Sequence, residues 1–414
     1  MTQAQLSGEH PTPRGSTRGR HELDPRFGSL RSTHLVTQSL GGLWAILGFA
    51  CNGTIEVWPD RLTIVGAPSS QRLIAGLAGP EGLRPVEVIE TSSSDESVAA
   101  FEGGRARARA AGRATLFLEA SEGVAEVEVE VLPLSPFATR VIRFEPGEGA
   151  GFGAERFPEV VLGPPKGGGL VAGSFDVLSL GAGGRIELGF DVMGADGPGP
   201  DLVVFENAFQ VSSSTVTFAE PAFVEATDGS AVLSFASAAG IEPVIAGSEG
   251  STIDPADPRA GGDRFDLSAA CGANDCRSEV LASIERLTIS DASGGPGVGT
   301  STGFDLDAVM LLNPVPREVD VIEASEPALQ LRVGDELHVP RFDAIAGDRR
   351  FFGVAAVLWV EPVDAHVSLE CISPDPNPCD DPAQLSLRGR AIGSATLHAR
   401  LGSTELKVPI EVVP

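Results

Sequence analysis

Apolar and polar residues alternate over short stretches of this chain, and no long segment has apolar residues at helical spacing. The clearest alternation covers residues 124–131, 185–190 and 406–413. Because successive side chains of a β-strand point to opposite faces, this pattern predicts half-buried strands with one solvated face. The 50 glycines and 31 prolines favour turns between such strands. The pattern therefore predicts an all-β protein.

The two ends of residues 52–414 carry a similar pattern. Each copy has a proline and a glycine seven positions apart, then a Gly-x-Ala-Thr-Leu motif and a final alternating strand. The marker residues are Pro59, Gly66 and Gly112 in the first copy, and Pro327, Gly334 and Gly393 in the second. Each copy is close to the ~100 residues of an Ig-like β-sandwich. We therefore predict Ig-like domains at residues 52–134 and 317–414.

The first copy also contains Ser-Ser-Asp-Glu-Ser-Val-Ala at residues 93–99. With this motif it resembles the bacterial Ig-like domains of group 2 type, which occur in adhesins and surface proteins. The second copy lacks the Ser-Ser-Asp motif, so its resemblance is weaker. The resemblance implies a spacer or scaffold role for these two domains.

Residues 137–314 lie between proline-containing links and are too long for one Ig-like domain. This length predicts a jelly roll or a larger β-sandwich. Motifs at residues 196–207, 218–225 and 303–309 resemble a poorly characterised family of bacterial cell-surface proteins with jelly-roll-like domains. The resemblance implies a lipoprotein signal in many members and, for some, an outer-membrane uptake receptor nearby. It does not identify a ligand.

Residues 1–51 are predicted to be a lipoprotein signal preceded by an extension. The apolar run 40–50 follows Arg31 and His34 and ends at Cys51, whose thiol would carry the lipid. A plain signal peptide or a buried core segment are the alternatives, and the run is shorter than the ~20 residues of a membrane span. Residues 1–33 exceed an ordinary n-region, so we expect the native start downstream of Met1. Asn52 after the cysteine favours the outer membrane.

The other four cysteines form two closely spaced pairs. Cys271 with Cys276, and Cys371 with Cys379, are predicted to close small disulfide loops, as expected in an oxidising compartment. Neither pair has the Cys-x-x-Cys spacing or the nearby histidines of a zinc site.

The negative charge of the chain argues against polyanionic partners. Its 57 acidic side chains against 30 basic ones give a net charge of −27. Nucleic acid and anionic lipid surfaces both need basic patches, so neither is an expected partner. Calcium sites are built largely from carboxylate oxygens, which this chain has in excess.

Residues 137–314 contain no His, Trp or Tyr. A Ser-His-Asp triad therefore has no base inside this segment, and aromatic platforms for sugars are scarce there. We predict that the chain is not an enzyme. A hydrolase with paired carboxylates is the less favoured alternative.

Oxygen donors cluster in the motifs of the central segment. Because strand side chains alternate, Asp305 and Asp307 are expected on one face, where two carboxylates repel each other unless a cation separates them. Further donors flank a Gly-Pro-Gly-Pro turn and the ends of neighbouring strands. The candidate calcium ligands are Asp196, Asp201, Glu206, Asn207, Glu220, Asp305 and Asp307. The alternative is that these residues cap turns or face solvent.

Together these patterns predict a non-enzymatic, lipid-anchored protein of the cell envelope, on either face of the outer membrane, that binds a surface ligand or partner, as an adhesin does. The alternative is an accessory that captures glycan or cobalamin-like cargo for an outer-membrane uptake system. A cleft with convergent polar groups would favour capture. A flat face would favour a scaffold or an adhesin.

Overall fold

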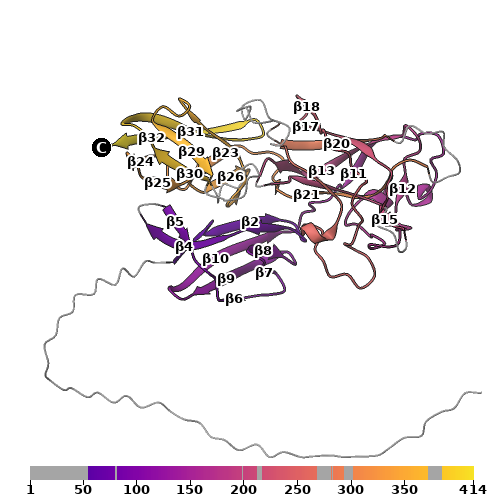
Figure 1. The fold of residues 1–414 in the computed structure, drawn as a ribbon, viewed down its shortest axis with the longest axis horizontal. Helices are drawn as coiled ribbons and strands as arrows, with labels where there is room; N and C mark the ends of the chain where they lie inside the picture. The colour runs from indigo at the N-terminus through magenta and orange to yellow at the C-terminus, as the bar shows by residue number, and fades with distance from the viewer. Residues whose placement is uncertain are drawn as a thin grey trace, which may run out of the picture. The chain divides into compact units, whose positions relative to one another are not determined.

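The strands predicted from the alternating pattern are present in the computed structural model of the chain (Figure 1). The structure describes residues 55–79, 82–197, 199–211, 217–267, 281, 283–292, 302–371 and 385–414. All belong to one unit, Asn52–Pro414. In this part of the chain the only helices are short 3-10 turns, so the all-β prediction is confirmed. Cys51 and the side chains of the other four cysteines lie outside the described residues.

The first repeat domain, residues 55–134, contains three small sheets with the orders β1-β4-β5, β2-β10-β9-β6 and β3-β8-β7. Its strands are β1 (Ile55–Trp58), β2 (Arg61–Val65), β3 (Ser70–Arg72), β4 (Ile74–Gly79), β5 (Gly82–Pro85), β6 (Glu90–Ser93), β7 (Ala99–Glu102), β8 (Arg105–Ala108), β9 (Gly112–Ala120) and β10 (Gly123–Leu132). Along β10, Val127 and Val129 are buried whereas Glu126 and Glu128 are exposed. The predicted alternation of this strand is therefore confirmed.

The second repeat domain, residues 317–414, has sheets with the orders β23-β26-β27, β24-β32-β31-β28 and β25-β30-β29. Its strands are β23 (Val321–Ala324), β24 (Leu329–Arg332), β25 (Glu336–His338), β26 (Phe342–Ala346), β27 (Arg349–Phe351), β28 (Val357–Glu361), β29 (Val367–Cys371), β30 (Leu385–Gly389), β31 (Gly393–Leu401) and β32 (Thr404–Val413).

The two repeat domains share one arrangement of strands. In each, an early strand pairs in parallel with the last strand, β2 with β10 and β24 with β32. The last strand also pairs antiparallel with the strand before it, through the Gly-x-Ala-Thr-Leu motif. The motif glycines, Gly112 and Gly393, both have φ of 152°. The repeat in the sequence thus corresponds to a repeated sheet.

The central domain, residues 137–315, is built on two antiparallel sheets and a small hairpin. The sheet orders are β11-β13-β20-β17-β18, with β22 also on β13, and β12-β21-β14-β19, and the hairpin is β15-β16. The strands are β11 (Arg140–Glu145), β12 (Leu178–Ser179), β13 (Arg185–Ala195), β14 (Leu202–Glu206), β15 (Phe209–Gln210), β16 (Thr217–Phe218), β17 (Ala222–Thr227), β18 (Val232–Ser234), β19 (Asp263–Phe265), β20 (Ser283–Asp291), β21 (Asp305–Leu311) and β22 (Pro314–Val315), and the 3-10 helices are η1 (Ala154–Arg156), η2 (Glu159–Val161) and η3 (Pro258–Ala260).

Strands β14 and β21 are buried on both faces. One face belongs to the main core, which also contains residues of β13 and β20; Val204, Val309 and Leu188 are among its members. The other face, which includes Phe205 and Met310, is covered by residues 244–260. Every residue of β14 and β21 is buried, and the carboxylates on these strands are therefore inside the domain.

The domains contact one another directly. The backbone N–H of Thr63 donates to the Phe352 carbonyl at 2.9 Å, and the guanidinium of Arg61 lies 4.7 Å from the centre of the Phe352 ring. The main core also continues from the central domain into the second repeat domain. Among the described residues no helix is long and apolar enough to cross a membrane.

Candidate functional site

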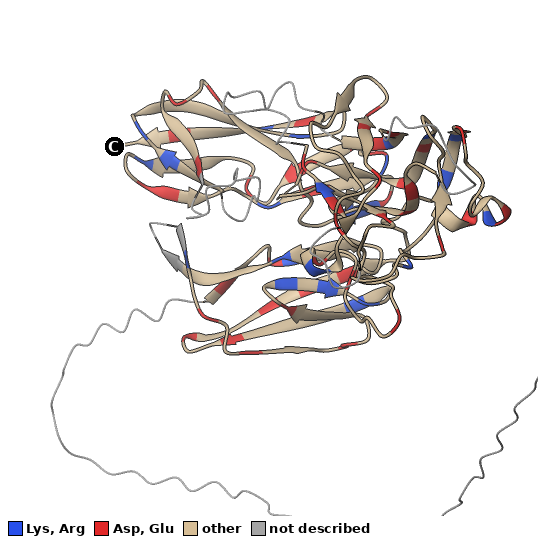
Figure 2. Ribbon diagram, turned by 45° about the vertical axis from the view of Figure 1, so that its right-hand side comes forward, with Lys and Arg blue, Asp and Glu red and all other residues tan. Residues whose placement is uncertain are grey.

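Acidic residues occur in all three domains (Figure 2), but those predicted to bind calcium form three separate groups within the central domain. The alternative that Asp305 and Asp307 face solvent is wrong, because both are buried. The groups are Asp196 with Asp201; Glu206 with Glu220 and Asp305; and Asn207 with Asp307.

The first group contains an acidic residue that the sequence did not single out. One carboxylate oxygen each of Asp196, Asp201 and Asp266 lie within 4.8 Å of one another. Asp201 is 0% exposed, and its two oxygens accept hydrogen bonds from the backbone N–H groups of Gly197 and Leu267 and from the Asn313 amide. Burial, followed by the charge of Asp196, raises the pKa of Asp201 well above its ordinary value. This group has the donors of a cation site, and Asp201 also organises its loop.

The second group lies where β14 and β21 pair. Glu206 pairs with Leu306, next to Asp305, and the exposed fractions of Glu206 and Asp305 are 1% and 4%. Burial, then the charges of Asp305 and Glu220, raise the pKa of Glu206 well above its ordinary value. Burial and Asp305 likewise raise the pKa of Glu220 to about 7. The carboxylates of this group therefore repel one another in a poorly solvated place.

A fourth carboxylate borders the second group. Asp263 on β19 pairs with Val204 of β14, and its Oδ2 accepts hydrogen bonds from the backbone N–H groups of Gly240 and Ile241. Gly240 has φ of 86°, and a Cβ there would lie 2.3 Å from the Glu220 carbonyl oxygen. Glycine is therefore required at position 240 to hold the segments of Asp263 and Glu220 together.

The third group fastens a loop. Both carboxylate oxygens of Asp307 accept from the backbone N–H of Lys166 at 3.0 Å, and Asn207 accepts from the backbone N–H of Ser174. Burial raises the pKa of Asp307 to about 7, despite that hydrogen bond. These contacts bind residues 166–174 to the sheet, so the group has a structural role.

Sequence reasoning missed Asp263 and Asp266 because their partners are distant along the chain. Both follow Gly261 and Gly262 in an otherwise ordinary polar stretch. Only the pairing of β19 with β14 brings them to the other carboxylates. No local motif could have identified them.

A different kind of site lies between the two repeat domains. A groove of about 710 Å³ is formed by β1, β10 and residues 337–341. Trp58 lines it, and the buried indole N–H has no hydrogen-bond acceptor within the described residues. Its polar and charged lining residues are Glu56, Asp60, Glu126, Ser325, Glu326, His338 and Arg341.

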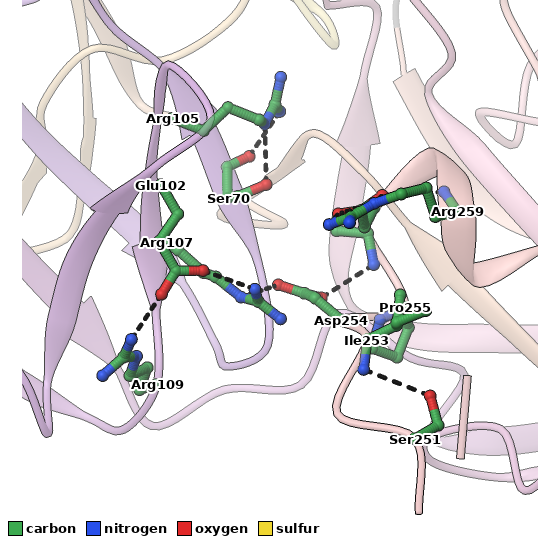
Figure 3. Close-up of polar contacts among 12 residues, drawn as sticks. Ser70, Glu102, Arg105, Arg107, Arg109, Ser251, Ile253, Asp254, Pro255 and Arg259 are labelled. Carbon is green, nitrogen blue, oxygen red and sulfur yellow. Dashed lines mark hydrogen bonds and ion pairs between the residues drawn. The ribbon is translucent and has the colours of Figure 1, made fainter. Parts of the chain in front are cut away.

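An ion-pair cluster joins the first repeat domain to the central domain (Figure 3). Arg107 Nε lies 2.8 Å from Asp254 Oδ2, and the same guanidinium lies 2.7 Å from Glu102. Arg109 also binds Glu102, and the two arginines lower the pKa of that carboxyl. The acidic and basic side chains of this cluster pair with one another and hold the first repeat domain against the central domain. We therefore assign the cluster a structural role.

Comparisons with known proteins do not identify a family. No family model matches the chain, and no curated protein matches it. Domains 1–6 of surface layer protein SbsC match over 87% of this chain, with 12% identity and a TM-score of 0.17, and the chain spans 40% of that structure. Mouse cadherin-23 EC22-24 matches over 87% of this chain and 99% of its own, with 12% identity and a TM-score of 0.15.

A third match is SGBP-B of the Bacteroides ovatus mixed-linkage glucan utilization locus, solved with a mixed-linkage heptasaccharide. It covers 87% of this chain and 71% of its own, with 9% identity and a TM-score of 0.15. TM-scores this low are not evidence of a shared fold or a shared function. The function of this chain must therefore be argued from its own sites.

Proposed function

We propose that the chain is a non-enzymatic binding module of the cell envelope that takes a ligand in the groove between its two repeat domains. The groove is the observation that carries this proposal. Its walls come from both repeat domains, and it combines apolar side chains such as Leu337 with several polar groups around Trp58. Concave sites with an apolar lining and a few polar groups are typical of ligand binding.

The lining restricts the chemistry of the ligand. Four of the lining side chains are carboxylic acids, and one, Arg341, is a cation that already pairs with Asp60 and Asp343. This charge repels polyanions such as nucleic acid and acidic glycans. Carboxylates accept hydrogen bonds from hydroxyl groups, and the half-buried indole of Trp58 adds a flat apolar surface. A neutral glycan fits this combination, which favours glycan capture for uptake as the second candidate function.

An array of immobilised neutral oligosaccharides tests the groove. The full chain is applied with two variants, Trp58→Ala and Glu326→Ala, and with the matched control Glu411→Ala on the exposed face of β32. Glu326 is exposed, so its variant tests the groove even if loss of Trp58 disturbs the fold. We expect the chain and the control to bind one glycan class and both groove variants to lose binding at least tenfold. Binding that survives both changes would overturn the proposed site.

Attachment at the outer membrane is proposed from the sequence alone. The apolar run before Cys51 supports lipidation of that thiol. Mass spectrometry of the N-terminal peptide from membranes of expressing cells tests it. We expect the peptide that carries Cys51 to be heavier by the mass of the attached acyl chains, and we expect this increase to be absent in Cys51→Ser. An unmodified Cys51 would contradict the anchor.

A further inference from the structure

A second groove lies between the two repeat domains, beside β27. It has a volume of about 740 Å³ and shares no lining residue with the groove around Trp58, so the two are separate. One wall is formed by residues 111–113 and 130–133 of the first repeat domain, and the other by residues 348–352 of the second. We call it the arginine groove, after the residues described next.

The lining of the arginine groove has the opposite sign of charge from the whole chain. It contains three arginines, Arg113, Arg349 and Arg350, against two carboxylates, Glu130 and Asp348. The lining therefore carries one net positive charge, in a chain whose net charge is −27. The groove around Trp58 is lined instead by four carboxylates and one arginine. A positive hollow in a negative protein attracts anions to that place.

Arg349 has all of its side-chain donors available for a ligand. It is exposed on β27, and within the part of the chain that the structure describes its guanidinium forms no ion pair and no side-chain hydrogen bond. The other two arginines are paired, Arg113 with Glu130 at 2.9 Å and Arg350 with Glu323 at 2.6 Å. A guanidinium has five N–H donors and no acceptor. The free charge of the groove is therefore that of Arg349.

A buried carboxylate fixes the position of Arg350. Asp343 is 3% exposed, its Oδ2 lies 3.4 Å from Arg350 Nη1, and its Oδ1 accepts from the backbone N–H of Gly353 at 3.2 Å. Glu323 binds the other terminal nitrogen of Arg350. Neither carboxylate lines the groove, and the two contacts leave further N–H donors of Arg350 unused. Arg350 is thus held in place before a ligand binds, which lowers the entropy that binding costs.

We propose that the arginine groove binds a small ligand with one oxyanion group, a carboxylate or a phosphate, between Arg113, Arg349 and Arg350. Guanidinium groups bind both of these oxyanions through paired N–H donors. The half-buried side chain of Phe352, which also lines the groove, adds an apolar surface for the rest of the ligand. A polyanion does not fit, because the net charge of −27 repels a ligand with many negative charges.

Isothermal titration calorimetry of the full chain at low ionic strength tests the site, with inorganic phosphate and glucuronate as the two probes. We expect one or both probes to bind the unchanged chain, and their affinity to fall about tenfold or more in Arg349→Gln and in Arg113→Gln. Tighter binding of phosphate would identify a phosphate ester as the ligand, and tighter binding of glucuronate a sugar acid. Arg113 is 81% exposed and Arg349 has no side-chain partner, so both variants are expected to fold.

Arg332→Gln is the matched control, because Arg332 is an exposed arginine of the second repeat domain that does not line the groove. It removes the same charge and should keep the affinity of the unchanged chain. An equal loss in Arg332→Gln and Arg349→Gln would show that only net charge matters and would overturn the proposal. Absence of binding by both probes, or binding that survives both groove variants, would also overturn it. Glu326→Ala, in the groove around Trp58, should leave anion binding unchanged, so this proposal does not rest on the proposed function.

Discussion

The guanidinium of Arg107 on β8 meets the carboxylate of Asp254 in the central domain at 2.8 Å, and the Asp254 side chain is only 3% exposed (Figure 3). Asp254 also accepts from the backbone N–H of Ala256. The pair thus ties the first repeat domain to the loop that covers β14 and β21. Removal of one partner leaves the other charge poorly compensated.

Arg107→Ala is therefore expected to lower the free energy of unfolding by about 1–3 kcal/mol. Arg113→Ala is the control, because Arg113 is 81% exposed and pairs with Glu130 on the surface of the same domain. Its cost should stay below about 0.5 kcal/mol. Chemical denaturation of both variants measures the difference. An equal loss in the free energy of unfolding for Arg107→Ala and Arg113→Ala would show that the contact between Arg107 and Asp254 adds no stability beyond that of a surface ion pair.

Asp201→Asn tests the loop of the first acidic group. Asp201 Oδ2 accepts from the backbone N–H of Leu267, and Oδ1 accepts from Gly197 and Asn313. Asparagine replaces one carboxylate oxygen with an NH2 group, which would then face an N–H donor in place of accepting a hydrogen bond from it. We therefore expect a loss of about 1–3 kcal/mol in the free energy of unfolding. Denaturation curves measure it, with the half-exposed Asp266→Asn as comparison. A loss of similar size in both variants would contradict a special role for Asp201.

Stability should fall as pH rises from about 4 to about 7 when calcium is removed. The folded pKa values of Glu220 and Asp307 are about 7, against ordinary values of 4.5 and 3.8. Between these limits the folded state binds more protons than the unfolded state, so each upward step in pH favours unfolding. Unfolding temperatures at pH 4.5 and 7.5 measure the effect. Asp307→Asn should flatten the slope, and an unchanged slope would exclude Asp307 as a source.

Phe352→Ala tests the contact between the repeat domains. The Phe352 ring lies under Arg61 at 4.7 Å and near Arg341 at 5.7 Å, while its backbone bonds with Thr63. Loss of the ring should cost about 1–2 kcal/mol and expose the contact to protease. Limited proteolysis is the measurement, with Phe223→Ala, 60% exposed, as the control. Equal cleavage of both variants would mean that the ring does not hold the contact.

The alternation of residues was enough to predict strands, because burial in β10 follows it residue by residue. The repeat likewise predicted a common sheet, since the same motif forms the final hairpin in both repeat domains. The predicted domain boundaries remain untested, because residues 52–414 form one unit. Periodicity could not show the burial of β21: a solvated face was an alternative for Asp305 and Asp307, but every residue of that strand is buried.

The grouping of the carboxylates could not be predicted from local patterns. Asp305 and Asp307 share a strand, yet they belong to different groups. Asp305 lies beside Glu206, whereas Asp307 accepts a hydrogen bond from the backbone N–H of Lys166. Asp266 joins Asp196 and Asp201 only after the long-range pairing of β14 with β19 has formed. The groove was equally hidden, because one wall comes from residues 55–126 and the other from residues 325–341, far apart in the sequence.

The parallel pairing of β2 with β10, and of β24 with β32, has a mechanical consequence. When the start of the early strand and the end of the last strand are pulled apart, the force runs along both strands in opposite directions. The ladder hydrogen bonds are then sheared together and cannot open one after another, as they would in a hairpin pulled from its open end. Each repeat domain thus pairs its early and last strands in a way that resists tension along these two strands.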